Sequence, residues 1–213
     1  MKYKAVLFDL DGTLLDTAPG LARAMNEVLV KYNFPPHSLR EYKTYIGNGI
    51  KALVDQSVPE DTSPELRDVL YKEKSSLYDQ YWKDGTSLFP EIPTMLTALQ
   101  DKGVKLAIFS NKEDFFTQKI VSAFLGQWHF AVVLGRTSEI PKKPDPTGVN
   151  MIVHRLPFES GEWLYVGDKD ADMNAANNAP MDFAWASWGY QDEVPLTCAQ
   201  VLHTPHDIIT LLG

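Results

Sequence analysis

The sequence predicts an α/β fold: a Rossmann-like parallel sheet with helices on both faces, plus an inserted all-helical cap domain. Three observations predict it. Short apolar runs alternate with helical patterns over residues 85–213, as expected for crossover units and a parallel sheet. One of these runs ends directly in Ser110, and another ends in Gly167-Asp168. Residues 17–83 carry helical patterns and no clear strand. We therefore expect a core of residues 1–15 and 85–213 and a cap of residues 16–84.

The first strand is the apolar run of residues 5–8, which ends in Asp9 and Asp11 and then Gly12. In an open parallel sheet, ligands bind beyond the carboxyl ends of the strands. Two carboxylates about 4 Å apart repel each other by roughly 4 kcal/mol at an effective dielectric constant near 20. Such a pair needs a cation between the groups or a proton on one of them. Gly12 adopts backbone conformations that other residues resist, and it turns the chain away from the sheet.

The string Asp9-Leu10-Asp11-Gly12-Thr13-Leu14 resembles the first signature of the haloacid dehalogenase superfamily, most of whose members are phosphatases. The resemblance implies that Asp9 is the nucleophile that becomes an aspartyl phosphate. It implies that Asp11 is the general acid and base. Both residues would hold Mg²⁺, Asp11 through its main-chain carbonyl. By the same resemblance, Gly12 and Thr13 are expected to contact the substrate.

Composition restricts the possible partners. The chain has 213 residues, 44% of them hydrophobic, which suits one large domain or a core with an inserted one. Its formal charge of −8 argues against nucleic acid and against an anionic membrane surface. Cys198 is the only cysteine, which fits a reducing cytosol, and we see no signal peptide or membrane-spanning run. We expect a cytoplasmic monomer or homodimer that acts on a small phosphorylated metabolite.

The inserted segment is expected to hold several helices. From Thr17, apolar residues recur at three- and four-residue steps until the proline-containing turn at 33–36. Shorter helical patterns begin near Leu39 and again near Ile50. Ser63 is a candidate N-cap for a long helix with a proline at its first position. The apolar positions of this long helix are Leu66, Val69, Leu70, Leu77 and Tyr81.

From Pro90 to the end of the chain, strands and helices alternate. The expected strands are residues 104–109, 130–134, 163–166 and 183–186. The expected helices are one through residues 95–99, others at 114–125 and 149–155, a short one through 173–176, and a last one starting near 205. Residues 141–146 contain three prolines and are expected to form a loop.

Ser110 follows the second apolar strand, so it should reach the same edge of the sheet as Asp9. A hydroxyl group there, with the backbone N–H groups that follow, can bind phosphate oxygens. The Ser-Asn-Lys sequence is also typical of an ordinary turn and helix cap. The resemblance implies a catalytic role for Ser110 and substrate contacts for Asn111 and Lys112.

Two later motifs complete the resemblance. Lys143, directly before Pro144, resembles the family's third motif, whose lysine neutralises the phosphate and the nucleophile. The segment 167–172 resembles the fourth motif, in which Asp168 is a metal ligand and Asp172 supports the metal shell or Lys143. Asp170 has no match in that motif and is expected to be solvated. Four motifs in the expected order, each at a strand end or in the loop after it, make the resemblance specific.

A charge count agrees with a magnesium cofactor. Asp9, Asp11, Asp168 and Asp172 supply up to four negative charges, and Mg²⁺ with Lys143 returns three positive ones. Mg²⁺ takes oxygen ligands and keeps waters or a substrate phosphate in its shell. Zinc is disfavoured because the five histidines are scattered and the cysteine is alone.

Substrate choice is expected to lie in the cap. Residues 45–49 resemble the cap signature of phosphoglycolate phosphatases, which places Gly47, Asn48 and Gly49 at the substrate; the alternative is an ordinary turn between helices. Segments 110–112, 143–146 and 188–190 also resemble that subgroup. The best candidate substrate is therefore 2-phosphoglycolate.

Two other functions stay open. A sugar-phosphate mutase of the β-phosphoglucomutase type shares both Asp9 and Asp11, and only its product distinguishes it. A non-enzymatic phosphate-binding regulatory domain would need a broken constellation, and none of the four motifs is broken. A dinucleotide-binding oxidoreductase is disfavoured because no Gly-x-Gly-x-x-Gly follows the first strand.

Overall fold

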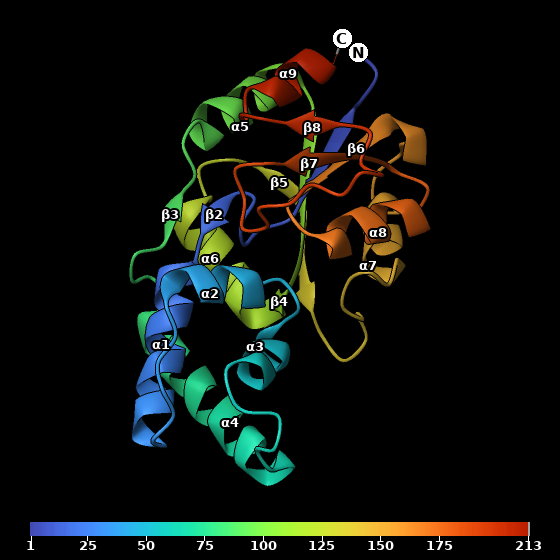
Figure 1. Cartoon of the computed structure of the whole chain (residues 1–213). Coiled ribbons are helices and arrows are strands. Elements are labelled where there is room, and N and C mark those ends of the chain that lie inside the picture. The colour runs from blue at the N-terminus through green and yellow to red at the C-terminus, as the bar shows by residue number, and fades with distance from the viewer. Residues whose placement is uncertain (213) are drawn as a thin grey trace.

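The structure is a computed structural model that describes residues 1–212 (Figure 1). It confirms the expected α/β fold with a helical insert. Its main sheet has six strands, and every hydrogen-bonded pair of neighbours in it runs parallel. In spatial order, the strands are β5 (Phe130–Arg136), β4 (Lys105–Glu113), β1 (Ala5–Phe8), β6 (Trp163–Gly167), β7 (Asp182–Ala186) and β8 (Val201–Leu202).

Strand β1 lies at the point where the strand order reverses. Phe8 of β1 is paired with Ile108 of β4 on one side and with Val166 of β6 on the other. The chain passes from β1 to β4 and β5, and it returns to the other side of β1 for β6 to β8. In open α/β sheets this reversal is where ligands bind. Asp9 directly follows β1 and therefore lies at that position.

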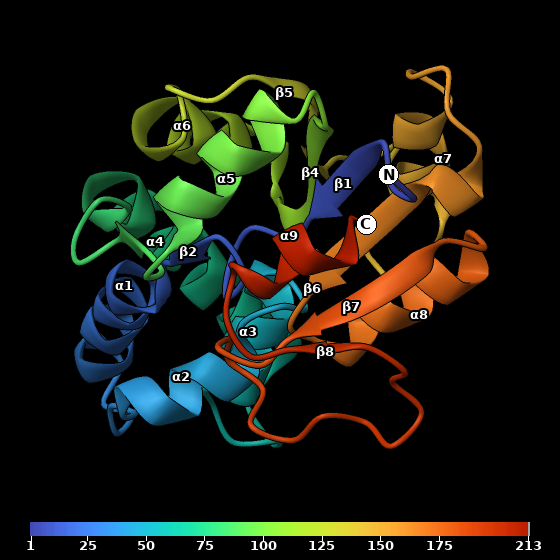
Figure 2. The same cartoon turned by 90° about the horizontal axis from the view of Figure 1, so that it is seen from above.

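Helices cover both faces of the sheet (Figure 2). One face carries α5 (Ile92–Asp101), α6 (Asp114–Phe124) and α9 (Asp207–Leu211), and the other carries α7 (Thr147–Val153) and α8 (Asp170–Asn178). A 3₁₀ turn, Ser160–Glu162, precedes β6. Val6 and Phe8 belong to the apolar cluster of the first face, and Ala5 and Leu7 belong to that of the second. Because β1 is buried on both faces, its sequence is a continuous apolar run rather than an alternating one.

The cap consists of α1 (Ala18–Lys31), α2 (Leu39–Tyr45), α3 (Ile50–Gln56) and α4 (Pro64–Tyr81). Helix α1 packs along α4. At Gly20 of α1 the two segments are so close that a Cβ atom would lie 2.5 Å from the carbonyl oxygen of Tyr81. The predicted N-cap of α4 is confirmed, since the Ser63 side chain accepts a hydrogen bond from the Leu66 N–H.

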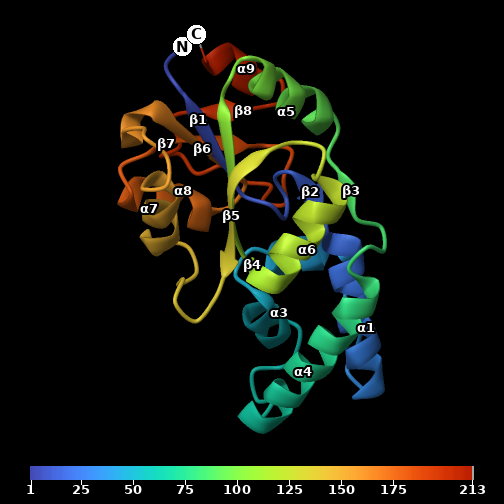
Figure 3. The same ribbon diagram turned by 180° about the vertical axis from the view of Figure 1, so that it is seen from behind.

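A short antiparallel ribbon joins the two ends of the insert. It pairs β2 (Leu15–Asp16) with β3 (Ser87–Leu88) and lies between the sheet and the cap helices (Figure 3). The two chain ends lie together at the opposite end of the molecule, where the Lys2 N–H donates to the Leu212 carbonyl. Among the described residues, no helix combines the length and the apolar character needed to cross a membrane.

The structure differs from the expected elements in three places. Strand β4 continues through residues 110–113 because Glu113 pairs with Arg136 of β5 beyond an irregularity in the register. Val69, expected on the apolar side of α4, is 40% exposed, and the buried residues of α4 are instead Leu70, Lys74 and Tyr78. The ribbon β2–β3 and strand β8 were not expected, since two-residue strands leave no periodicity in the sequence.

Candidate active site

Three buried carboxylates from separate parts of the chain meet beyond the ends of β1 and β6. Asp9 follows β1, Asp168 follows β6, and Asp172 lies in the first turn of α8. Each offers a carboxylate oxygen, and these oxygens all lie within 4.8 Å of one another. Because β1 and β6 are parallel neighbours, the residues that follow them emerge at the same edge of the sheet, which explains why such distant residues meet.

Lys143 is the buried cation of this cluster. Its Nζ donates to Asp9 Oδ1 at 2.5 Å, to Asp172 Oδ1 at 2.6 Å and to the carbonyl of Phe109 at 3.1 Å. Its backbone N–H donates to Asn111 Oδ1 at 2.7 Å, which attaches the loop before α7 to β4. Three carboxylates and one ammonium leave two negative charges unbalanced.

This imbalance changes the acidity of the carboxylates. Burial raises the pKa of Asp9 well above its ordinary value; the charges of Asp172 and Asp168 add to this, while Lys143 opposes it. Burial, together with Asp172, raises the pKa of Asp168 to about 6. Hydrogen bonds from the Tyr190 N–H (2.7 Å) and the Thr13 hydroxyl (3.1 Å) oppose the shift of Asp168. A further cation among these carboxylates would favour their ionised forms.

The donor set fits a divalent metal ion with a preference for oxygen ligands. All three nearby side chains offer carboxylate oxygens, and their surplus charge equals that of one Mg²⁺ ion. In the sequence analysis Asp172 stood outside the metal ligands. In the structure it lies within the same carboxylate cluster, with Oδ1 bonded to Lys143 and to the Tyr165 hydroxyl and Oδ2 accepting the Lys169 N–H.

The Asp11 side chain does not belong to this cluster. Its Oδ2 lies 3.0 Å from Lys112 Nζ, and its Oδ1 accepts a 2.5 Å hydrogen bond from the Thr17 hydroxyl. Burial alone would lower the pKa of Lys112, but the Asp11 carboxylate and the Tyr78 hydroxyl outweigh it and raise that pKa. A metal contact by Asp11 would therefore fall to its main-chain carbonyl.

Gly12 and Thr13 lie against Asp168. Gly12 has a φ of 98°, and a Cβ atom there would lie 2.4 Å from Asp168 Oδ2. The Thr13 side chain is fully buried and donates to Asp168 Oδ1. Neither residue lines the cavity that lies between the core and the cap. Their contacts orient a carboxylate of the cluster.

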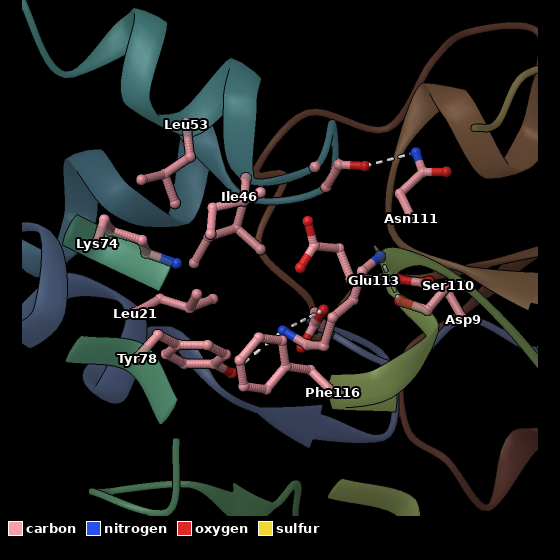
Figure 4. A pocket seen from close by; sticks show the side chains of 15 residues that line it. Asp9, Leu21, Ile46, Leu53, Lys74, Tyr78, Ser110, Asn111, Glu113 and Phe116 are labelled. Carbon is pink, nitrogen blue, oxygen red and sulfur yellow. Dashed lines mark hydrogen bonds and ion pairs between the residues drawn. The ribbon is translucent and has the colours of Figure 1, made fainter. Parts of the chain in front are cut away.

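A cavity of about 40 Å³ lies between the core and the cap (Figure 4). From the core it is lined by Asp9, Asp11, Ser110, Asn111, Lys112, Glu113 and Phe116. From the cap it is lined by Leu21, Ile46, Gly47, Gly49, Ile50, Leu53, Lys74 and Tyr78. The carboxylates beyond β1 thus face a space that is bounded on its other side by the cap.

The loop between α2 and α3 contacts the core at this cavity. The Asn111 side-chain amide donates to the Gly47 carbonyl at 2.8 Å (Figure 4). Gly47 and Gly49 line the cavity, whereas Asn48 is exposed and is not part of its lining. Beside this loop, Lys169 Nζ donates to the Lys43 carbonyl at 3.0 Å. Side chains of the core thus hold the cap by hydrogen bonds to its backbone carbonyls.

The comparison with protein families agrees with this arrangement. Residues 6–186 match the family described as haloacid dehalogenase-like hydrolase. The chain belongs to that family. The match spans β1 to β7 and thus includes every residue of the carboxylate cluster.

Curated relatives of this haloacid dehalogenase-like hydrolase match over nearly its whole length. It is 33% identical to the phosphoglycolate phosphatase of Aquifex aeolicus, over 98% of this chain and 96% of that protein. It is 30% identical to the phosphoglycolate phosphatase of Vibrio cholerae, over 98% of this chain and 95% of that protein. A crystal structure from Haemophilus somnus, described as a predicted phosphoglycolate phosphatase, superposes with a TM-score of 0.92 at 26% identity, covering 100% of this chain and 99% of that one.

Sequence reasoning missed several residues of this hydrolase that line the cavity, among them Lys74 and Tyr78 of α4. A signal for them was present. Leu70, Lys74 and Tyr78 are spaced four residues apart, so they lie on one side of the helix. A lysine on the buried side of an amphipathic helix is unusual and indicates a role beyond packing.

Proposed function

We propose that this haloacid dehalogenase-like hydrolase is a Mg²⁺-dependent phosphatase that hydrolyses a small phosphate monoester, with 2-phosphoglycolate as the best candidate substrate. The observation that carries the proposal is the buried Asp9 carboxylate, which contacts Lys143, belongs to an acidic cluster with a surplus of negative charge, and lines the cavity between the core and the cap. A carboxylate in such a position can act as a nucleophile.

In the proposed mechanism, a lone pair of the Asp9 carboxylate attacks phosphorus in line, and the bond from phosphorus to the alcohol oxygen breaks. The product on the protein is an aspartyl phosphate. Lys143, the Ser110 hydroxyl and nearby backbone N–H groups stabilise the charge on the equatorial oxygens. Mg²⁺, held by Asp9, Asp168 and the Asp11 carbonyl, would supply positive charge that reduces the repulsion between carboxylate and phosphate.

Asp11 is proposed to transfer the proton. It donates to the departing alkoxide, and it later removes a proton from the water that hydrolyses the aspartyl phosphate. In the structure Asp11 is bonded to Lys112 and to the Thr17 hydroxyl. We expect Lys112 to exchange Asp11 for a phosphate oxygen when the ester binds, which frees Asp11 to carry the proton while Thr17 keeps it in position.

The nucleophile is tested by replacing Asp9 with Asn, which keeps the size but removes the attacking oxygen anion. We expect turnover of p-nitrophenyl phosphate in the presence of Mg²⁺ to fall by roughly three orders of magnitude or more. The Asp170→Asn variant is the control, because Asp170 is an exposed acid close to the site in sequence. Near wild-type activity of Asp9→Asn would end the nucleophile assignment.

The choice of 2-phosphoglycolate rests on three supports: the names of the relatives, the small cavity, and the resemblance of residues 45–49 to a phosphoglycolate phosphatase cap. A panel of phosphorylated metabolites, assayed for inorganic phosphate with and without Mg²⁺, tests both substrate and cofactor. Including a hexose 1-phosphate and analysing for an isomer separates this proposal from a mutase. Release of phosphate from no ester in the panel would refute it.

A further inference from the structure

The side chain of Lys74 is buried without an obvious reason in the fold. Its exposure is 0%, and it lies on the buried side of α4 between Leu70 and Tyr78. Within residues 1–212, it is the only charged side chain whose buried polar atom has no hydrogen-bond partner; the other two such groups are neutral indoles. A buried ammonium without a partner is strongly disfavoured, so residues of this kind are expected to have a ligand or a special role.

The ammonium of Lys74 points into the cavity (Figure 4). Around it are the apolar side chains of Leu21, Ile46 and Leu53. The ammonium also lies over the ring of Tyr78, whose centroid is 4.4 Å from Nζ. Lys74 therefore lies in the apolar part of the cavity lining, with its ammonium covered by the surrounding side chains.

The acidic side chains near Lys74 in the cavity already have partners elsewhere in the protein. Asp11 is paired with Lys112, and Glu113 accepts from the Tyr71 hydroxyl at 2.5 Å and lies 3.4 Å from Arg136. Burial lowers the pKa of Lys74 well below its ordinary value; Lys112 adds to this, and Asp11 and Glu113 only oppose it from a distance. The protein itself thus supplies no partner for the Lys74 ammonium among its described residues.

We infer that Lys74 is a substrate-binding residue that recognises a carboxylate on the alcohol part of the phosphate ester. This inference rests on the proposed function, which places the phosphoryl group at Asp9 and Ser110. Figure 4 shows these two residues and Lys74 on opposite sides of the cavity. A ligand that reaches from Asp9 towards Lys74 must present its far end, the leaving group, to the ammonium. The substrate class is therefore the phosphate esters of short hydroxy acids.

The apolar surroundings make this recognition selective. An ion pair formed away from water is stronger than one in solution. An ester whose alcohol part is neutral would fill the cavity but leave the ammonium unpaired. The site would therefore bind such an ester poorly and would prefer its carboxylate analogue. With Lys74 at the carboxylate end of the ester, the second lysine of the cavity, Lys112, is available for the phosphate end. In the structure Lys112 contacts Asp11 and the Tyr78 hydroxyl.

The test compares two esters of nearly equal size, 2-phosphoglycolate and 2-hydroxyethyl phosphate, which differ in the carboxylate. The measured quantity is the ratio of their kcat/KM values with Mg²⁺ present. For the wild type we expect a preference for 2-phosphoglycolate of about 100-fold or more. In Lys74→Met, which keeps the length and removes the charge, we expect the preference to fall to within about 10-fold.

Lys72→Met is the matched control, because Lys72 is an exposed lysine on the same helix, and we expect it to keep the wild-type preference. Lys74→Gln provides a second neutral variant with the same expected loss of preference, should the Met variant not fold. The Lys74→Met protein is expected to be at least as resistant to heat as the wild type, because an apolar side chain replaces a buried polar group that has no hydrogen-bond partner among the described residues.

The outcomes separate the two proposals. If both neutral Lys74 variants hydrolyse the esters with an unchanged preference, the role of Lys74 is refuted and the phosphatase proposal stands. The same holds if the wild type shows no preference for the carboxylate. If the wild type releases phosphate from neither ester and from no other phosphomonoester, the proposed function fails, and the role of Lys74 fails with it.

Discussion

At the scale of single residues, the site is governed by the balance of charge among buried groups. Asp168 shows the effect most directly. It is fully buried, and burial with the neighbouring Asp172 raises its pKa to about 6. Its hydrogen bonds from Thr13 and Tyr190 hold the carboxylate in one orientation but do not remove that cost. The position is therefore costly for the fold until a cation binds, which is typical of functional sites.

This pKa gives a prediction for the metal-free protein. The folded-state pKa of Asp168 lies above its ordinary value of 3.8, so between about pH 4 and pH 6 the folded state binds the proton more tightly than the unfolded state does. The free energy of unfolding should consequently fall as the pH rises through this window, by an amount on the order of 3 kcal/mol. Asp168→Asn should lose this part of the pH dependence.

The measurement is urea unfolding of both proteins in the presence of EDTA at several pH values from 4 to 7. The informative quantity is the difference in free energy of unfolding between wild type and Asp168→Asn, because the other titrating groups contribute to both. A difference that does not change with pH over this range would contradict the assignment of a raised pKa to Asp168.

At the scale of elements, function depends on how the cap helices are held together and against the core. Helix α1 carries the chain out of the site, and α4 brings Lys74 and Tyr78 back to the cavity. The two helices pack along each other, and Gly20 permits their close approach beside the carbonyl of Tyr81. The small residue on α1 thus determines how near α4 lies to the active site.

Replacing Gly20 with Ala tests this packing. A Cβ atom there would lie 2.5 Å from a backbone oxygen of the other segment, and a backbone cannot give way as a flexible side chain can. We expect a loss of about 1–3 kcal/mol in the free energy of unfolding. Gly161→Ala is the control, because nothing lies within 4 Å of a Cβ atom at that position.

Urea denaturation of the two alanine variants measures the effect. Equal free energies of unfolding for Gly20→Ala and the wild type would mean that α1 and α4 can move apart freely. Since alanine favours a helix over glycine by roughly 1 kcal/mol, a net loss at Gly20 would have to overcome that gain. Such a net loss would therefore measure the cost of the steric contact between the two segments.

At the scale of the whole molecule, two bodies enclose one cavity. The sheet core carries the carboxylates, and the cap lines the other side of the space that they face. We propose the division given in the sequence analysis, with a core of residues 1–15 and 85–213 and a cap of residues 16–84. The ribbon β2–β3 lies close to both proposed boundaries and holds the entry and exit of the insert side by side. The chain ends lie far from this junction (Figure 1).

Because the carboxylate cluster joins β1, β6 and α8, a metal ion bound there should stabilise the core as a whole. At a Mg²⁺ concentration 100-fold above Kd, the expected stabilisation is about 2.7 kcal/mol. For a chain of this size that corresponds to a rise in Tm of roughly 5–10 °C. Thermal unfolding followed by circular dichroism, with Mg²⁺ and with EDTA, measures it.

Two variants make this measurement specific. Asp168→Asn should abolish the rise in Tm because it removes a proposed ligand, whereas Asp170→Asn, with an exposed side chain, should keep it. A full rise in Tm in Asp168→Asn would place the ion elsewhere on this acidic protein.

Much of the fold could be predicted from local patterns. The continuous apolar run Ala5–Phe8 indicates a strand buried on both faces, and the serine before Pro64 indicates a helix start, because both depend only on neighbouring residues. The end of β4 and the two-residue strands could not be predicted in this way. Their hydrogen bonds come from partners far away in the chain, as with Glu113 and Arg136.

The sequence by itself determined the fold class, the family and the positions of the motif residues, because strand ends and short signatures are local features. Only the tertiary structure decided which charges meet. It brings Asp172 into contact with Lys143, pairs Asp11 with Lys112 and, among residues 1–212, gives Lys74 no hydrogen-bond partner. The physical reason is that Coulomb interactions and desolvation depend on distance and burial, and both are fixed only when the sheet edge and the cap close around one cavity.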